Sequence, residues 1–321
     1  MFISPNDITT LTLEITSFCN LHCPQCPRFN AAGYLNNELA LDHLNVDILN
    51  NIHLNNFPNL ENIIFEGDNG DALMHPHFLL FLDFFKEYKV QLTTNGSIRS
   101  TKWWQELAKF PNLSVTFSID GLDDTNEIYR IGASFNKIID NAKAFIDAGG
   151  VASWKYIIFR HNEAQVPIAK TLADDIGFDK FFTIISERSW FHGDKWEVFI
   201  NGKYRYDIHP STSLVEFNGT AHKVIKDQTI QANSCLLKKY GDLYINYKGH
   251  VLPCCMTSSY TYTSNIKSQM WQRIVGDIAY INLYDFTLSD ILSSDFYISY
   301  LPNSFNGFPW IAPCCATFCS Q

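Results

Sequence analysis

The sequence predicts an α/β protein built on a parallel sheet. Short apolar strands and helical segments alternate through the first 190 residues, at the spacing of βαβ units. Most of these strands end in polar turns, and ligand sites of parallel α/β folds gather at the carboxyl ends of strands. The alternation stops near residue 190, so we expect one domain over residues 1–190 and a smaller one over residues 191–321.

Six segments have the apolar, β-prone composition of strands. The first alternates Leu11, Leu13 and Ile15 with polar residues, as a half-buried strand does. In chain order the predicted strands span residues 8–16, 60–65, 90–94, 113–119, 154–159 and 181–185.

Five of the six strands are followed by a segment with helical apolar spacing. Gly149-Gly150 and Gly177 stand where the last two of these segments end, and glycine is the usual residue after a helix C-terminus. The predicted helices span residues 42–54, 78–88, 103–110, 135–148 and 164–176.

The chain beyond residue 190 has the character of β-hairpins. Asn201-Gly202 lies between two β-prone arms, and Asn-Gly favours a tight two-residue turn. Residues 243–253 also read as a hairpin, which brings the flanking Cys235 and Cys254 together. A short helix is expected over residues 288–293.

Composition narrows the class of protein. The hydrophobic fraction is 46%, yet no run of 18 apolar residues and no signal peptide is present, so no membrane association is expected. The net charge of −9 argues against non-specific nucleic-acid binding, which needs a basic surface. We therefore expect a cytoplasmic, reducing environment, in which nine cysteines indicate metal or redox chemistry instead of disulfides.

Three of the cysteines form a compact motif directly after the first strand. Cys19, Cys23 and Cys26 have C-x3-C-x2-C spacing. A loop this short can place three thiolates on one iron–sulfur cluster but cannot easily supply a fourth ligand, whereas ferredoxin clusters and structural zinc sites take four. The motif therefore indicates a cluster with one iron open to a small molecule. The alternatives are a zinc knuckle or a set of buried thiols.

This motif resembles the signature of the radical S-adenosylmethionine (SAM) superfamily. The resemblance implies a partial (β/α)6 TIM-like barrel with a [4Fe–4S] cluster on the three catalytic cysteines. The open iron of such a cluster binds SAM, and one electron cleaves SAM to a 5′-deoxyadenosyl radical. Gln25 departs from the family pattern, which has an aromatic residue before the third cysteine.

Polar turns at the later strand ends resemble the SAM-binding segments of the superfamily, in the family's order. Asn69-Gly70-Asp71-Ala72 stands where the family has Gly-Gly-Glu-Pro, so Asp71 would receive the SAM amino group. Arg130 of Tyr129-Arg130 would grip the SAM carboxylate. Taken singly, these residues would be an ordinary acidic turn and a solvated charge. The resemblance assigns cofactor binding to Gly70, Asp71, Asn95, Ser118, Asp120, Arg130 and Asn162.

The C-terminal cysteines resemble the SPASM/Twitch extension of radical SAM enzymes, which holds an auxiliary [4Fe–4S] cluster. The implied ligands are Cys235, Cys254, Cys315 and Cys319, although the closing pair departs from the usual C-x2-C spacing. A four-cysteine zinc site is the alternative. Cys255 and Cys314 are left over. Each is either a hydrogen-atom donor to a product radical or a small buried side chain.

The resemblance implies hydrogen abstraction from a small molecule or a peptide, followed by oxidation, dehydrogenation or epimerisation. The first strand begins near residue 8, which leaves no room for an N-terminal peptide-binding domain. A peptide maturase working with a separate peptide-binding partner is therefore an alternative, and a non-catalytic, metal-stabilised binding protein is another. A reductant such as flavodoxin or ferredoxin is expected. Aromatic residues near the domain junction would line the substrate cleft or simply pack: Trp190, Phe191 and Trp196.

Overall fold

A computed structural model describes residues 2–185, 195–212, 235–261 and 278–306. The chain divides into two compact units, each made of segments far apart in the sequence. The first contains Met1–Phe18, Asn37–Val90 and Ile225–Gln321, and the second contains Cys19–Asn36 and Gln91–Val224. The division expected at residue 190 remains a prediction.

The expected fold class is confirmed: the sheet is mostly parallel, like that of a partial TIM barrel, and the six predicted strands are its strands β1 to β6. β3 begins in the first unit and ends in the second. All six lie within or close to the predicted segments: β1 (Thr10–Leu13), β2 (Asn62–Phe65), β3 (Lys89–Thr94), β4 (Leu113–Ser118), β5 (Val151–Ile158) and β6 (Lys180–Ile185).

In the first unit, β1 is paired in parallel on both edges. Thr10 is in register with Asn62 of β2 on one edge and with Asp242 of β9 (Asp242–Ile245) on the other. β10 (Val251–Leu252) then pairs with β9 in antiparallel fashion. The hairpin expected at residues 243–253 is therefore present, and it extends the sheet beyond β1.

The helices of the first unit are short: α1 (Phe78–Phe84), α7 (Leu236–Tyr240), α9 (Leu288–Leu292) and α10 (Leu301–Asn303). The α-helix expected over residues 42–54 is wrong, because this stretch forms two 3-10 helices, Val46–Asn51 and Leu54–Asn56. The stretch is rich in asparagine, whose side chain competes for backbone hydrogen bonds. Asn45, for example, accepts a hydrogen bond from the Asp47 N–H at 3.0 Å.

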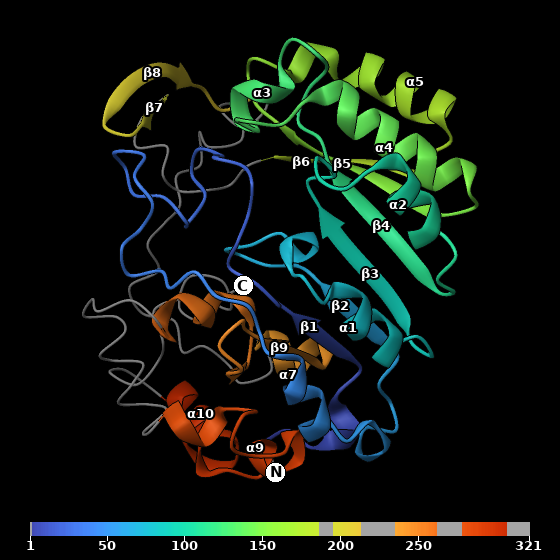
Figure 1. The fold of residues 1–321 in the computed structure, drawn as a ribbon. Helices are drawn as coiled ribbons and strands as arrows, with labels where there is room; N and C mark the ends of the chain where they lie inside the picture. Colours follow the sequence, from blue (N-terminus) through green and yellow to red (C-terminus); the bar gives the residue numbers. More distant parts are fainter. Residues whose placement is uncertain (1, 186–194, 213–234, 262–277, 307–321) are drawn as a thin grey trace. The chain divides into compact units, whose positions relative to one another are not determined.

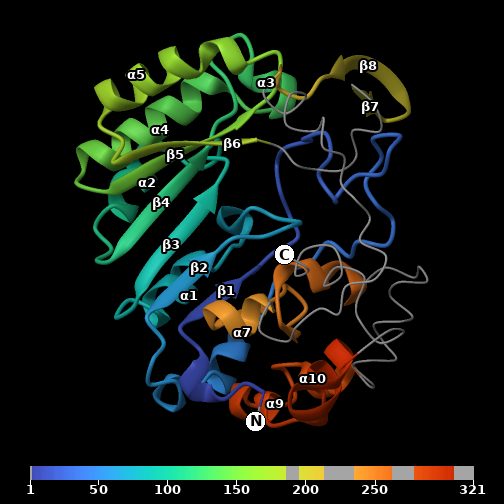
Figure 2. The ribbon, with the colours of Figure 1, turned by 180° about the vertical axis from the view of Figure 1, so that it is seen from behind.

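In the second unit, β4 pairs in parallel with β5, and β5 with β6. Its helices are α2 (Thr101–Leu107), α3 (Asn126–Tyr129), α4 (Phe135–Asp147) and α5 (Val166–Ile176). Front and back views place α2, α4 and α5 on the same side of β4 and β5 (Figures 1 and 2). Trp104 of α2 and Phe145 of α4, both buried, meet edge to face there. The helices thus pack against the sheet, and the candidate site residues are carried by the loops at the strand ends.

A separate two-stranded sheet follows β6 in the second unit. β7 (Trp196–Ile200) and β8 (Lys203–Ile208) are antiparallel and joined by Asn201-Gly202, as predicted. Both turn residues have positive φ, 50° and 76°, as a tight hairpin turn requires. The Tyr206 hydroxyl anchors the hairpin by donating to the Ile128 carbonyl at 2.8 Å.

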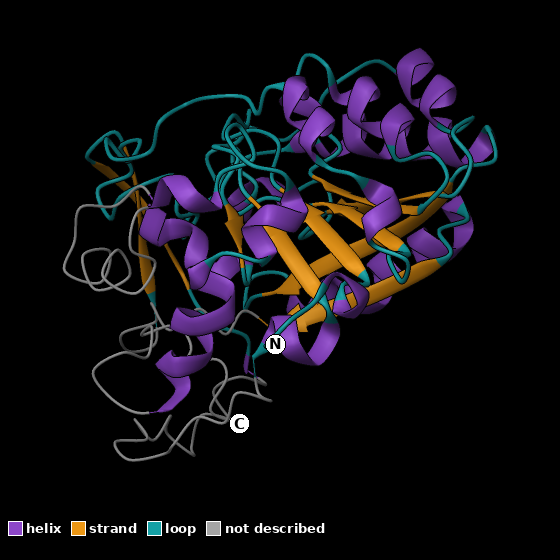
Figure 3. Cartoon of the chain, turned by 90° about the horizontal axis from the view of Figure 1, so that it is seen from below, coloured by secondary structure: helices purple, strands orange, loops and turns teal. Residues whose placement is uncertain are grey.

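The candidate residues lie mainly outside helices and strands. Figure 3 draws such loops in teal beside the orange strands and purple helices. No helix within the described ranges is long and apolar enough to cross a membrane.

Candidate functional site

The cysteine loop, residues 19–26, belongs to the second unit and is fixed by its own backbone. The Cys26 N–H donates to the Cys23 carbonyl at 3.2 Å, and Gln25 between them has a left-handed φ of 64°. The buried Arg28 guanidinium donates to the Leu21 carbonyl at 3.2 Å. These contacts fold the loop into a compact turn and fix the backbone that carries its three thiols.

Asn95, just after β3, contacts the first thiol of the loop. Its Nδ2 lies 3.7 Å from the Cys19 Sγ and donates to the Asn20 Oδ1 at 3.1 Å. Its Oδ1 accepts the Ser97 N–H at 2.9 Å, which fixes the amide with its donor side toward the sulfur. The predicted strand-end residue Asn95 therefore lies at the cysteine loop.

The second thiol of the loop lies near both a cation and another thiol. Burial raises the pKa of Cys23 to about 11, and the Arg130 guanidinium opposes this by charge and by a hydrogen bond. The neighbouring Cys26 thiol raises it further. A thiol with this pKa keeps its proton at neutral pH unless a metal takes the proton's place.

Arg130 is held from behind by Asp120. Their Nε and Oδ2 atoms are 2.6 Å apart, and the Asp120 side chain is fully buried. The other carboxylate oxygen accepts the Ile157 N–H at 2.6 Å. This pairing raises the pKa of Arg130 above its usual range, although burial opposes the charge. The guanidinium predicted to grip a carboxylate is thus kept charged and turned toward the cysteine loop.

Asn162 and Ser118 support the same strand ends. The Asn162 Nδ2 donates to the carbonyls of Asp120 and Ile157, each at 2.9 Å, and its Oδ1 accepts the Phe159 N–H at 2.7 Å. Ser118 is the buried last residue of β4. In this structure the Asn162 side chain therefore braces the ends of β4 and β5, and its assignment to SAM stays a prediction.

Gly70 and Asp71 lie in the first unit. A Cβ at Gly70 would overlap the Thr16 carbonyl, so the turn passes against the chain just after β1 as only glycine allows. The Asp71 Oδ1 accepts the Leu73 N–H at 3.1 Å, which caps a short 3-10 helix, Ala72–Met74.

Glu14, which follows β1, was not identified from the sequence. Its side chain is buried and accepts the Asn69 N–H at 2.6 Å. Burial and the nearby Asp68 carboxylate raise the pKa of Glu14 to about 8. No sequence signal pointed to it, because a single glutamate after a strand usually faces solvent.

Of the C-terminal cysteines, the structure describes Cys235, Cys254 and Cys255. Tyr297 is buried and donates to the Val251 carbonyl at 3.0 Å. Burial, followed by the nearby thiols of Cys235 and Cys254, raises its pKa. Both hairpin-flanking thiols therefore act electrostatically on Tyr297, and their role as ligands of one cluster stays a prediction. The other two predicted ligands, together with one leftover cysteine, fall outside the described residues: Cys314, Cys315 and Cys319.

Cys255 follows Cys254 directly and is surrounded by carboxylates. Burial raises the pKa of its thiol to about 12, and the carboxylates of Asp68, Glu66 and Asp242 add to this. Its role as a hydrogen donor remains a prediction.

The donor chemistry of the cysteine loop suits an iron–sulfur cluster. Three thiols occur within eight residues, an amide N–H faces the first, and a buried guanidinium lies beside the second. Such donors stabilise the negative charge of a thiolate-bound cluster. Within the part of the chain that is described, no three His, Cys, Asp or Glu side chains are already arranged around one metal position.

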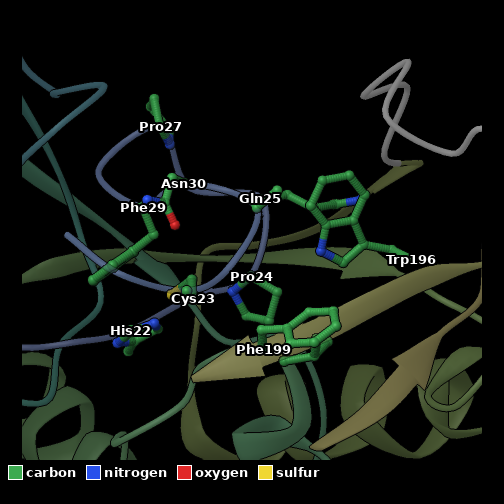
Figure 4. A pocket seen from close by; sticks show the side chains of 12 residues that line it. His22, Cys23, Pro24, Gln25, Pro27, Phe29, Asn30, Trp196 and Phe199 are labelled. Carbon is green, nitrogen blue, oxygen red and sulfur yellow. The ribbon is translucent and has the colours of Figure 1, made fainter. Parts of the chain in front are cut away.

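A pocket of about 470 Å³ opens between the cysteine loop, residues 27–33 and the β7–β8 hairpin, all in the second unit (Figure 4). Trp196, an aromatic residue singled out from the sequence, lines it, whereas Trp190 and Phe191 lie outside the described residues. Besides Trp196 and Cys23, the lining residues were not identified from the sequence, because the pocket forms only where the hairpin docks against the loop. The lining residues are His22, Cys23, Pro24, Gln25, Pro27, Phe29, Asn30, Ala31, Gly33, Trp196, Val198 and Phe199.

A comparison with protein families assigns a family to the region that contains the cysteine loop. Residues 13–172 match the model of the Radical SAM superfamily. These residues belong to the radical SAM superfamily. The family assignment supports SAM and a [4Fe–4S] cluster as cofactors of the radical SAM region. It leaves the auxiliary cluster untested.

A curated relative matches part of this chain. It is the tungsten-containing aldehyde ferredoxin oxidoreductase cofactor-modifying protein of Pyrococcus furiosus, 32% identical over 128 residues. The match covers 38% of this chain and 33% of the relative, so the chain matches about a third of that relative's length.

Two solved structures share the radical SAM fold. Streptococcus suis SuiB bound to precursor peptide SuiA has a TM-score of 0.57 at 16% identity, covering 94% of this chain and 67% of SuiB. Native anSMEcpe with bound AdoMet has a TM-score of 0.59 at 14% identity, covering 91% of this chain and 82% of that chain. At these identities the likeness concerns the fold.

Proposed function

We propose that this protein is a radical SAM enzyme that reductively cleaves SAM and uses the 5′-deoxyadenosyl radical to abstract hydrogen from a small molecule or a peptide. The observation that carries the proposal is the cysteine loop, which lies inside the superfamily match and has Asn95 and Arg130 at its sulfurs. A [4Fe–4S] cluster with one open iron supplies the electron for this cleavage.

The chain's own residues hold and shield this chemistry. Cys19, Cys23 and Cys26 supply the thiolates, and Asn95 donates toward the first of them. Arg130, kept charged by Asp120, places a cation beside the second. Its remaining guanidinium N–H groups are suited to a carboxylate such as that of SAM.

The auxiliary site belongs to the same proposal. Cys235 and Cys254 near Tyr297, together with Cys315 and Cys319, would hold an auxiliary [4Fe–4S] cluster. Four thiolates complete such a cluster. A cluster there would accept an electron from the substrate radical, which gives net oxidation, or would hold the substrate by direct ligation. A flavodoxin or ferredoxin is the proposed reductant.

Relatives support both substrate classes. SuiB has been solved with a precursor peptide and anSMEcpe with the Cp18Cys peptide, whereas the Pyrococcus relative is described as cofactor-modifying. Oxidation, dehydrogenation or epimerisation of such a substrate is the proposed outcome.

Anaerobic reconstitution of the full chain tests the proposal. Two clusters give about eight irons per chain, and dithionite with SAM should yield 5′-deoxyadenosine. Cys23→Ala should abolish this product while about four irons remain. Cys254→Ala is the matched variant: it should remove the distal iron and leave SAM cleavage by the first site. Deoxyadenosine formation that survives Cys23→Ala would refute the catalytic assignment. One or two zinc ions without SAM cleavage would instead indicate a non-catalytic metal-stabilised protein.

A further inference from the structure

The pocket between the cysteine loop and the hairpin is walled by apolar and aromatic side chains. Trp196 and Phe199 come from β7 and border the pocket together with Pro24 of the cysteine loop (Figure 4). Val198 of β7 also lines it. Its volume of about 470 Å³ is within the range of small-ligand sites. The lining contributed by the cysteine loop and residues 27–33 includes Pro24, Pro27 and Phe29.

The hairpin is fastened to this loop by its backbone. The Gly202 N–H donates to the Ala32 carbonyl at 2.8 Å, and the Asn201 N–H to the Gly33 carbonyl at 3.3 Å. A Cβ at Gly33 would overlap the Phe199 carbonyl, so the contact requires glycine. The pocket is therefore built by specific main-chain contacts between two segments of one unit.

Apart from Cys23, the proposed cluster ligand, the pocket lining offers a ligand no ionisable acid and no lysine or arginine. None of its lining residues is Lys, Arg, Asp or Glu, and its polar side chains are His22, Gln25 and Asn30. A phosphate or carboxylate placed there would lose its hydration without gaining an ion pair. Flat rings, by contrast, stack or meet edge to face with aromatic walls.

We propose that this pocket receives an uncharged aromatic ring of the substrate. The proposal rests on the proposed function, because Cys23 lines the same pocket and a ring bound there would lie beside the radical chemistry. The ring belongs either to an aromatic residue of a peptide or to a heteroaromatic small molecule.

Isothermal titration calorimetry on the reconstituted full chain, without reductant, tests the inference. N-acetyl-L-tryptophanamide represents the peptide source and 6-methylpterin the small-molecule source. N-acetyl-L-leucinamide and indole-3-acetate are the aliphatic and charged controls. At least one uncharged ring should bind ten-fold or more tightly than both controls. Equal binding of the leucine or charged probe would overturn the proposal.

Variants of the pocket test whether the ring binds in it. Ala31→Trp should fill the pocket and weaken ring binding at least ten-fold. Phe199→Leu keeps an apolar wall but removes its ring, and should weaken binding about five-fold. Arg205→Ala, an exposed position on the same hairpin, should leave the affinity unchanged. Unaltered binding in both pocket variants would locate the ring elsewhere and refute the proposal.

SAM itself carries an aromatic base, so competition is informative. Saturating SAM should leave ring affinity within two-fold; displacement by SAM would show that the pocket holds adenine and overturn the inference. Deoxyadenosine formation is measured separately on the same preparation. Ring binding without SAM cleavage would sink the proposed function, whereas cleavage without ring binding would sink only the pocket assignment.

Discussion

The Asp120 Oδ2 lies 2.6 Å from the Arg130 Nε, with the Asp120 side chain fully buried and the Arg130 side chain 14% exposed beside the cysteine loop. Asp120 is also tied to the Ile157 N–H, so its position is set by β5. The pair therefore connects the framework of the sheet to Cys23.

Asp120→Asn should destabilise the protein, because Arg130 would keep its charge in the interior without a counterion. Breaking a buried pair on one side costs about 3–5 kcal/mol of unfolding free energy. Chemical denaturation of the full chain measures this. Asp174→Asn, which removes the exposed Lys170–Asp174 pair on α5, is the matched control and should cost less than about 0.5 kcal/mol. Equal losses in the two variants would contradict the role given to Asp120.

Glu14 should make stability depend on pH. Its pKa is raised from 4.5 to about 8 in the folded protein, so the folded state binds more protons than the unfolded state between these values. The contribution of protonated Glu14 to the free energy of unfolding is present in full below pH 4.5 and is lost as pH rises through about 8. Glu14→Gln keeps an acceptor for the Asn69 N–H but cannot ionise.

The stability of Glu14→Gln relative to the parent should therefore rise with pH across this window, by on the order of 3–5 kcal/mol. Denaturation at pH 5 and pH 8.5 gives the two differences. A parallel pH profile for the two proteins would show that Glu14 titrates normally.

Gly33→Ala should loosen the hairpin from the loop. Gly33 has a φ of 73°, and an added Cβ would also overlap the Phe199 carbonyl. Gly149→Ala is the matched control, because Gly149 has a φ of 94° with no atom near its Cβ position. The control should lose about 1–2 kcal/mol from backbone strain alone, and Gly33→Ala about 1–3 kcal/mol more.

Limited proteolysis should cleave Gly33→Ala within residues 196–208 faster than it cleaves Gly149→Ala. If both variants lose the same stability and resist protease equally, the hairpin does not depend on this contact.

Asn95→Ala should lower the reduction potential of a reconstituted N-terminal cluster. The lost N–H donor faces the Cys19 Sγ, and donors to cluster sulfur favour the reduced, more negative form. One hydrogen bond corresponds to a shift on the order of 50 mV. Redox titration followed by electron paramagnetic resonance measures it. Ser97→Ala, which keeps the Asn95 donor, is the control and should shift the potential less; a larger shift there would reverse the assignment.

The sequence was informative where the signal is local. The C-x3-C-x2-C spacing of Cys19, Cys23 and Cys26, the Asn201-Gly202 turn and the order of the six strands are all set within short stretches. Local propensity failed at residues 42–54, where apolar spacing suggested an α-helix and asparagines gave 3-10 turns.

Only the tertiary structure decided which distant groups meet. Asp120 and Arg130 are ten positions apart. The docking of Phe199 near Gly33 joins residues more than one hundred positions apart, and the pairing of β9 with β1 joins residues more than two hundred positions apart. The sequence by itself determined the kinds of side chain that stand at each strand end. The partners of these side chains depend on packing. Burial and long-range contacts set each group's neighbours and its charge, and no local sequence pattern encodes them.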